Sequence, residues 1–230
     1  MDIAIIVGLD VVSGIASLVL ISAGLAVIFG MMKIINLAHG EFLMLGAYAT
    51  VLSVSAGVNI WFAMLVIAPV FVGLVGVVVE RCLIRFLYGR LVDSMLATWG
   101  LSLVIVGGTT MIFGNTIVGV SSPLGGFQVG AYQSSLYRPF LALMALLLML
   151  MVYGVMRYTR AGLIARAVMQ NPGMAATLGV NPARVYMATF GIGAAMSGLA
   201  GGLLAPIAGV VPTMGAAFIA KAFITVVGGG

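Results

Sequence analysis

Charged side chains are scarce in this sequence, and their scarcity excludes a soluble fold. Only 7% of the 230 residues are Asp, Glu, Lys or Arg, whereas 63% are hydrophobic. A soluble domain carries roughly 25% charged residues. Ten basic and five acidic side chains cannot build a soluble surface on a chain of this length. The composition therefore indicates an integral membrane protein.

Other absences narrow the functions that the chain can have. A single cysteine, Cys82, excludes an internal disulfide. The first ten residues lack a basic segment and a small-residue cleavage site, so we interpret them as retained rather than as a signal peptide. The pattern G-x-x-x-x-G-K-[ST] does not occur, so the chain cannot cradle nucleotide phosphates by that motif. We expect no catalytic residues, no metal site, no cofactor and no nucleic-acid partner.

Uncharged runs predict an all-α, polytopic integral membrane protein with about 6–7 transmembrane helices, at about 20 residues for each span. The predicted spans are 11–32, two within 42–79 that SVSAGVN at 53–59 separates, one from 94 to about 113, 140–156, 185–205 and a weaker segment at about 214–227. A Gly-, Ser-, Pro- and Asn-rich stretch after 113 predicts a loop. Because the chain stops on three glycines beside an apolar segment, we expect it to be C-terminally truncated.

The basic residues predict which side each loop occupies. Counted along the predicted spans, two of them (Arg138 and Lys221) fall on one side, and the other eight fall on the opposite side: Lys33, Arg81, Arg85, Arg90, Arg157, Arg160, Arg166 and Arg184. Cytoplasmic loops of membrane proteins carry the excess of Lys and Arg. The loops at 81–93 and 157–184 are therefore predicted to be cytoplasmic, with the N-terminus outside.

The loop 159–185 contains two helix-start signals. Asn-Pro occurs at 171–172 and again at 181–182, and Asn is a good N-cap while Pro suits the first helical position. Gly179 stands where a helix stop is expected. These signals predict a short helix over 172–178, in which Met174 and Leu178 share one face. Such a helix can simply rest on lipid headgroups, or it can dock a soluble partner.

The segment INLAHGEF at 34–41 places polar residues between two apolar runs, and it has two interpretations. In the structural one, it lies at the cytoplasmic end of the first span and Asn36 caps a helix that begins at Leu37. His39 then bonds a backbone carbonyl, Gly40 allows close packing and Glu41 lies near the positive helix end. In the functional one, Asn36, His39 and Glu41 form a polar break that lines a translocation path.

A proton relay in this segment is not expected. His39 and Glu41 are two positions apart, so they do not face each other on a helix. The acidic residues Asp10, Glu41, Glu80 and Asp93 all fall at or near predicted span ends.

A second pattern predicts close helix packing. Within AAMSGLAGG at 194–202, small residues recur every four positions in two neighbouring stripes, which favours the close approach of membrane helices. The expected packing residues are Gly193, Ser197, Gly198, Gly201 and Gly202. The stripes suit packing within the chain, and a role in a subunit interface is the alternative.

Four stretches together resemble one family of proteins. They are IFGMMKIINLAHGEFLMLGAYAT (28–50), ERCLIRFLYGR (80–90), LATWGLSL (96–103) and RAVMQNPGMAATLGVNPARV (166–185). The sequence resembles the permease subunits of branched-chain amino acid ABC importers, a family that includes urea and short-chain amide permeases. The likeness covers about residue 12 to 230, almost the whole chain.

The resemblance implies a single transmembrane permease domain over 1–230, with a cytoplasmic coupling loop at 157–184, in a bacterial or archaeal plasma membrane. It implies a second homologous permease subunit, two cytoplasmic ATPase subunits, an external solute-binding protein and membrane lipid as partners. The ATPases would hydrolyse ATP in trans, so the chain itself is not expected to be an enzyme. The implied ATPase-coupling residues are Arg166, Gln170, Asn171, Met174, Ala175 and Leu178.

The substrate and the transport class stay open at the level of sequence. A branched-chain amino acid is the first expectation, but LYGRLVDSMLATWGLSL (87–103) looks at least as much like the urea permeases. A secondary carrier or channel that needs no ATP is an alternative of another class. An inert membrane scaffold is the simplest alternative.

Overall fold

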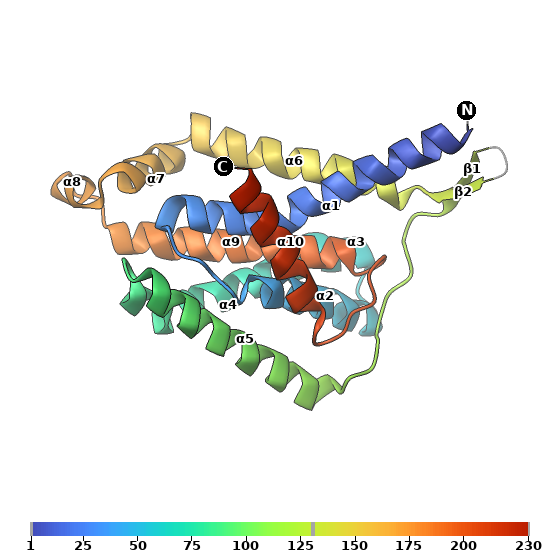
Figure 1. Cartoon of the computed structure of the whole chain (residues 1–230), viewed down its shortest axis with the longest axis horizontal. Helices are drawn as coiled ribbons and strands as arrows, with labels where there is room; N and C mark the ends of the chain where they lie inside the picture. Colours follow the sequence, from blue (N-terminus) through green and yellow to red (C-terminus); the bar gives the residue numbers. More distant parts are fainter. Residues whose placement is uncertain (1, 130–131, 230) are drawn as a thin grey trace.

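The computed structural model describes residues 2–129 and 132–229, which form a bundle of helices (Figure 1). The helices and their bounds in chain order are α1 Asp2–Met32, α2 His39–Ser55, α3 Ile60–Phe62, the π-helical turn η1 Ala63–Ile67, α4 Ala68–Cys82, the 3-10 turn η2 Ile84–Leu87, α5 Leu91–Phe113, α6 Tyr137–Tyr158, α7 Arg160–Gln170, α8 Pro172–Thr177, α9 Pro182–Leu204 and α10 Met214–Gly228.

Within the residues that the structure describes, five helical segments are long and apolar enough to cross a membrane. They are Val7–Met32, Ile60–Cys82 (which joins α3, η1 and α4), Leu91–Phe113, Tyr137–Tyr158 and Pro182–Leu204. The shorter helices α2 and α10 pack against each other; α2 also packs against α9 and α4, and α10 packs against α1. These two helices account for the other two predicted segments. The prediction of an all-α, multi-pass membrane protein is thus confirmed.

One element was not predicted. The strands β1 (Gly126–Val129) and β2 (Tyr132–Ser135) pair as an antiparallel ribbon within the stretch that the sequence assigned to a loop. They lie at the same end of the bundle as the start of α1 (Figure 1).

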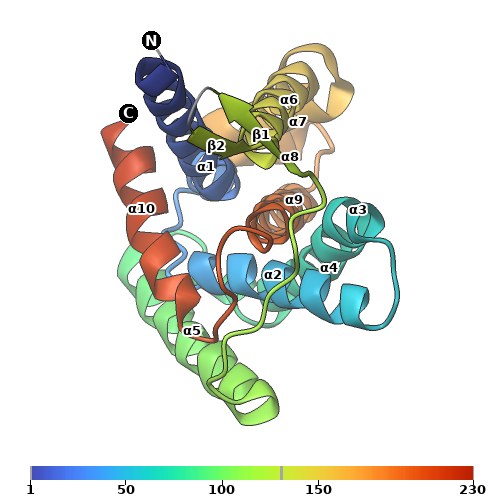
Figure 2. The same cartoon turned by 90° about the vertical axis from the view of Figure 1, so that its right-hand side faces the viewer.

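Helix α9 runs through the middle of the bundle, where an end-on view shows it surrounded by α1, α2, α4 and α6 (Figure 2). It contacts α4, α2 and α1. Small residues allow this closeness: a side-chain carbon added at Gly201 would collide with the backbone of Leu43, and one at Gly198 would meet the backbone of Ala68. Membrane helices associate through such tight contacts because lipid offers them no hydrophobic drive.

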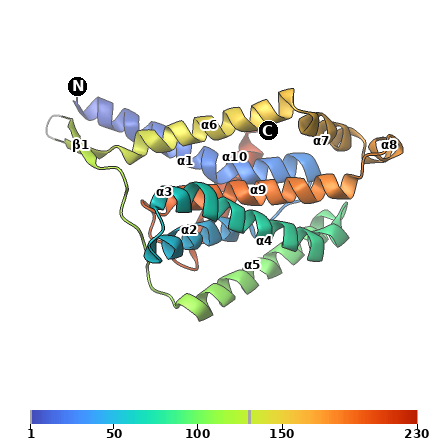
Figure 3. The ribbon, with the colours of Figure 1, turned by 180° about the vertical axis from the view of Figure 1, so that it is seen from behind.

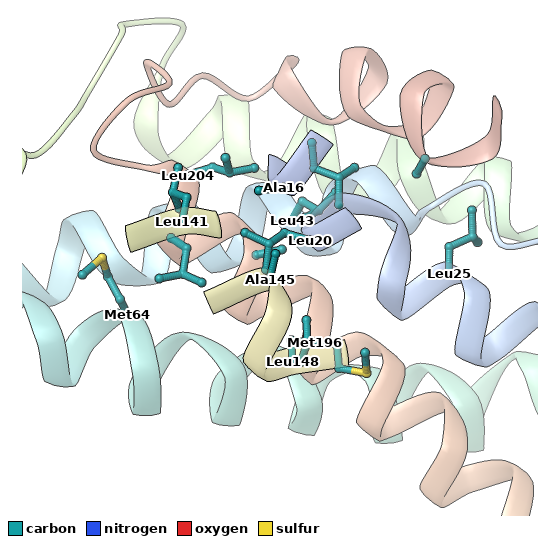
Figure 4. Close-up of a cluster of buried hydrophobic side chains, with 14 of the residues drawn as sticks. Ala16, Leu20, Leu25, Leu43, Met64, Leu141, Ala145, Leu148, Met196 and Leu204 are labelled. Carbon is teal, nitrogen blue, oxygen red and sulfur yellow. The ribbon is translucent and has the colours of Figure 1, made fainter. Parts of the chain in front are cut away.

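The largest apolar cluster joins α1, α6 and α9 (Figure 4). Leu20 of α1, Leu141 of α6 and Leu204 of α9 are buried together there. Tyr137 begins α6 at this cluster, and its hydroxyl donates a hydrogen bond of 2.7 Å to the backbone oxygen of Leu203. This bond satisfies the polar atom of a fully buried aromatic side chain.

The two arginine-bearing loops lie at one end of the bundle. Helices α7 and α8 protrude there, and the junction of α4 with α5 is at the same end in both lengthwise views (Figures 1 and 3). The N-terminus and the β-ribbon are at the opposite end. This arrangement agrees with the prediction that residues 81–93 and 157–184 share one side of the membrane.

Candidate functional site

The segment that joins α1 to α2 folds back into the bundle. After α1 ends at Met32, Lys33 adopts a left-handed conformation with a φ of 54°. Such a φ is uncommon for a residue other than glycine. The chain then returns along α1, so that Nε2 of His39 lies 2.8 Å from the backbone oxygen of Ile21. Ile21 is about three turns before the end of α1. The predicted position of INLAHGEF at the end of the first span is therefore wrong.

His39 connects three helices from its buried position at the start of α2. A carbonyl oxygen can only accept a hydrogen bond, so Nε2 is the donor to Ile21 of α1. In the neutral imidazole, Nδ1 is then an acceptor, and the hydroxyl of Ser197 on α9 lies 3.2 Å from it. The expected bond from His39 to a backbone carbonyl is present, and its acceptor lies on a different helix.

Asn36 orders the turn before α2 instead of capping the helix. Its side-chain oxygen accepts a hydrogen bond of 3.0 Å from the backbone nitrogen of Ala38. The helix begins at His39, with Ala38 at the N-cap position and no side-chain capping bond. The predicted helix start at Leu37 is corrected by two residues, because the Asn36 turn is completed first.

Glu41 is buried inside the bundle, with only 3% of its surface exposed. The hydroxyl of Ser102 on α5 donates a hydrogen bond to one carboxyl oxygen. Glu41 lies in the first turn of α2, so it is near a helix end as predicted, but the returning segment places that end inside the bundle. His39 and Glu41 contact different helices, as their spacing predicted.

Helix α5 meets this region through a polar seam, defined here as Thr98 and Ser102 of α5 with Leu37 and Glu41. The hydroxyl oxygen of Thr98 accepts a bond of 3.0 Å from the backbone nitrogen of Leu37. Among the described residues, three buried side-chain atoms have no hydrogen-bond partner: Oε2 of Glu41 in this seam, Nδ2 of Asn36 just before it in sequence, and the hydroxyl of Tyr48 further along α2. Buried polar atoms without partners are rare in folded proteins, so the seam is a candidate for contact with a polar solute.

Sequence reasoning did not single out Thr98 and Ser102 as site residues. A signal was present, because Ser94, Thr98 and Ser102 recur every four positions and so share one face of a helix. The pairing with Glu41 was not predictable from that face alone.

The small residues expected to pack do so within the chain. All five are buried, and an added side-chain carbon at Gly193 would meet Ile28 of α1, while one at Gly202 would meet Thr50 of α2. Ser197 bonds the backbone oxygen of Gly193 and faces His39.

The loop at the arginine-rich end has the predicted caps. The side-chain oxygen of Asn171 accepts from the nitrogen of Met174 at 2.9 Å, and that of Asn181 accepts from the nitrogen of Arg184 at 3.3 Å. Gly179 has a φ of +86°, which suits glycine at a helix stop.

The candidate docking residues of this loop differ in exposure. Met174 and Leu178 are 60% and 78% exposed, Gln170 and Asn171 are exposed, and Arg166 is half-buried. Ala175 is buried within the chain, so its side chain is not presented to a partner. The candidate surface therefore loses Ala175 as a contact residue.

Comparisons with known proteins agree on one family. The family model described as "Branched-chain amino acid transport system / permease component" matches residues 8–230. The chain is 31% identical over 228 residues to the high-affinity branched-chain amino acid transport system permease protein LivH of Escherichia coli K12, a match that covers 92% of this chain and 74% of LivH.

Other relatives carry similar names. LivH of Salmonella typhimurium is also 31% identical over 228 residues, with the same shares of the two chains covered. The probable branched-chain amino acid transport permease protein LivH of Methanocaldococcus jannaschii is 25% identical over 230 residues, covering 93% of this chain and 70% of that protein. No solved structure gives a significant match.

Proposed function

The chain belongs to the permease component family of branched-chain amino acid transport systems, and from this premise we propose that it is the membrane subunit of an ATP-driven importer of branched-chain amino acids. The observation that carries the proposal is the match over residues 8–230, together with relatives whose names state this transport function. In the proposed complex, a second permease chain completes the channel in a bacterial or archaeal plasma membrane. A binding protein delivers the solute from outside, and two ATPase subunits supply the energy.

The exposed face of α8 is the proposed ATPase contact. Met174 and Leu178 present apolar side chains to the surroundings at the end of the bundle. The sequence after Asp93 contains no acidic residue, so the arginines of the loop have no carboxylate on α6 to α9. Exposed apolar side chains with arginines nearby are suited to a groove lined by acidic residues on a soluble partner.

Cross-linking tests this contact with a matched control. In a Cys82→Ser background, which removes the exposed native thiol, we expect Met174→Cys to capture an ATPase subunit. Ala175→Cys, one residue away but buried, should capture much less. Capture of lipid alone from Met174→Cys would refute the proposed contact.

A functional test uses the same face. Met174→Asp combined with Leu178→Asp should abolish solute-driven ATPase activity, while changing the free energy of unfolding by less than about 0.5 kcal/mol because both side chains are exposed. Intact coupling in this variant would favour a carrier or channel that needs no ATP.

The polar seam is the proposed contact for the moving solute. Non-helical backbone at membrane depth is tolerated where it is buried in protein or lines a cavity. Residues 33–38, which include Asn36, form such a segment directly before His39 and Glu41 in the first turn of α2. The unpartnered atoms of Asn36 and Glu41 leave hydrogen-bonding capacity for a polar solute. The orientation follows the positive-inside rule, with the arginine-rich end in the cytoplasm.

Uptake into proteoliposomes distinguishes the substrates. With all partners present, we expect radiolabelled leucine to accumulate on ATP addition and urea not to accumulate. Accumulation of urea or a short-chain amide, with no leucine uptake, would replace the proposed substrate by that of the urea permeases. No flux of either solute would favour the inert scaffold.

A further inference from the structure

Two adjoining cavities form an apolar cleft on the side of the bundle away from the polar seam. Their volumes are about 540 and 530 Å³, and they share the lining residues Val27, Met31, Val152, Met156 and Met196. We call this cleft the α1–α6 cleft. Its walls come from α1, α6, α7 and α9.

The walls of the α1–α6 cleft suit a hydrocarbon chain. Valine and methionine dominate the lining, and methionine adapts its shape to irregular apolar partners. The two small hydroxyls in the walls are already bonded: Ser22 donates to the backbone oxygen of Leu18 at 2.7 Å, and Thr189 donates to that of Val185 at 2.8 Å. A polar solute would therefore find few partners here, unlike at the polar seam.

One end of the cleft carries a positive charge. Among the described residues that line it, Arg184 is the only charged one. Arg157 and Arg160 follow or precede the lining residues Met156 and Ala161 directly in sequence. The ion pairs found among the described residues involve Asp10 and Asp93, so no carboxylate there neutralises Arg184.

The length of the cleft matches one leaflet of a bilayer. Along α1 its lining runs from Val19 to Met31, which spans about 18 Å at the rise of an α-helix. The hydrocarbon core of a bilayer is about 30 Å thick, so one leaflet is about half of this. A cleft of this length, apolar along its walls and cationic at one end, has the profile of a single phospholipid.

We propose that the α1–α6 cleft binds an anionic phospholipid, with an acyl chain between α1 and α6 and the phosphate on Arg184. Helix α7 contacts α6, α1 and α9 around this cleft and leads directly into α8. The lipid thus lies where α7 and α8 join the rest of the bundle. An effect of the bound lipid on coupling to the ATPase rests on the proposed function, whereas the binding of the lipid to the cleft does not.

Lipid retention tests the binding directly. The chain is purified from nanodiscs that contain equimolar phosphatidylcholine and phosphatidylglycerol, and retained lipid is measured by native mass spectrometry. We expect phosphatidylglycerol to be retained, and Arg184→Gln to weaken its retention about fivefold, the usual effect of one basic residue on anionic lipid. Arg81→Gln removes an exposed arginine outside the cleft and should leave retention unchanged.

A second variant tests the acyl-chain site. Ala188 lines the cleft and is exposed, so Ala188→Trp should fill the space and reduce retention of both lipids. Equal retention of the two lipids, or retention that neither variant changes, would overturn the proposal. If Ala188→Trp does not fold, Arg184→Gln still decides, because its side chain is exposed.

The regulatory effect has its own readout. In the reconstituted complex, phosphatidylglycerol should raise solute-driven ATPase activity of the unaltered protein, and Arg184→Gln should lose that increase. Retained lipid without an activity change would refute regulation and keep the binding site. Capture of another protein chain, rather than lipid, by a photoreactive group at Ala188 would show that the cleft is a subunit interface and would overturn the lipid proposal.

Discussion

Helices α5 and α9 have almost the same hydropathy and opposite surroundings. Their mean hydropathies are 1.7 and 1.5. In an 18-residue stretch of each helix, however, 17% of the α5 residues are buried against 72% of the α9 residues. Small residues let the backbones of α1, α2 and α4 approach α9. Helix α5 carries large exposed side chains such as Trp99 and Val104. Hydropathy thus predicts that a helix is in the membrane, and side-chain size decides whether it lies inside the protein.

The contacts of the two helices also differ in kind. Helix α9 is held along its length by backbone contacts, whereas α5 is attached through the polar seam and the stacked rings of Tyr48 and Phe113, whose centroids are 4.9 Å apart. Few buried apolar contacts give an element low local stability. We therefore expect α5 to move more easily than α9, which suits a helix beside the proposed solute path.

The largest expected effect comes from adding the same side chain to each helix. Gly201→Leu drives a branched side chain into the backbone of Leu43, which cannot yield. We expect a loss of about 3 kcal/mol in the free energy of unfolding, at the upper end for overpacking. Thermal denaturation in detergent measures it. Gly100→Leu on α5 meets nothing within 4 Å and should be tolerated. Equal damage from both variants would remove the contrast.

A smaller effect is expected where α9 meets His39. His39→Ala removes the bonds to Ile21 and Ser197, at about 1 kcal/mol each. Ser197→Ala removes only one of them. Folded yield and denaturation midpoints should rank the variants in that order. Normal stability with abolished uptake in His39→Ala would instead indicate a direct role in solute passage.

The smallest change in stability is expected at the seam, with a larger change in motion. Ser102→Ala leaves both oxygens of buried Glu41 without a partner, at about 1–2 kcal/mol. Hydrogen exchange should rise in α5 and stay unchanged in α9. Thr110→Ala is the control, because Thr110 donates to Val106 within α5. A rise in both helices would mean that α5 is not a separate unit.

Local signals in the sequence were sufficient for the ends of α8 and the start of α9, but not for the start of α2. The Asn-Pro pairs and Gly179 predicted the start and stop of α8 and the start of α9, because capping involves residues a few positions apart. The charge-free runs predicted the spans, since each span must satisfy its own backbone in lipid. The stripe of small residues on α9 predicted close packing, although it named no partner helix.

Only the tertiary structure decided where the polar residues of INLAHGEF lie. The sequence gives no sign that the chain turns at Lys33 and re-enters the bundle, because the turn is stabilised by contacts that are remote in sequence. Glu41 meets Ser102, 61 positions away, and His39 meets Ser197, 158 positions away. Thus the sequence by itself determined the family, the spans and the caps of α8 and α9, because spans and caps depend on neighbours along the chain. The buried carboxylate, the polar seam and the contrast between α5 and α9 depend on which helices become neighbours in space.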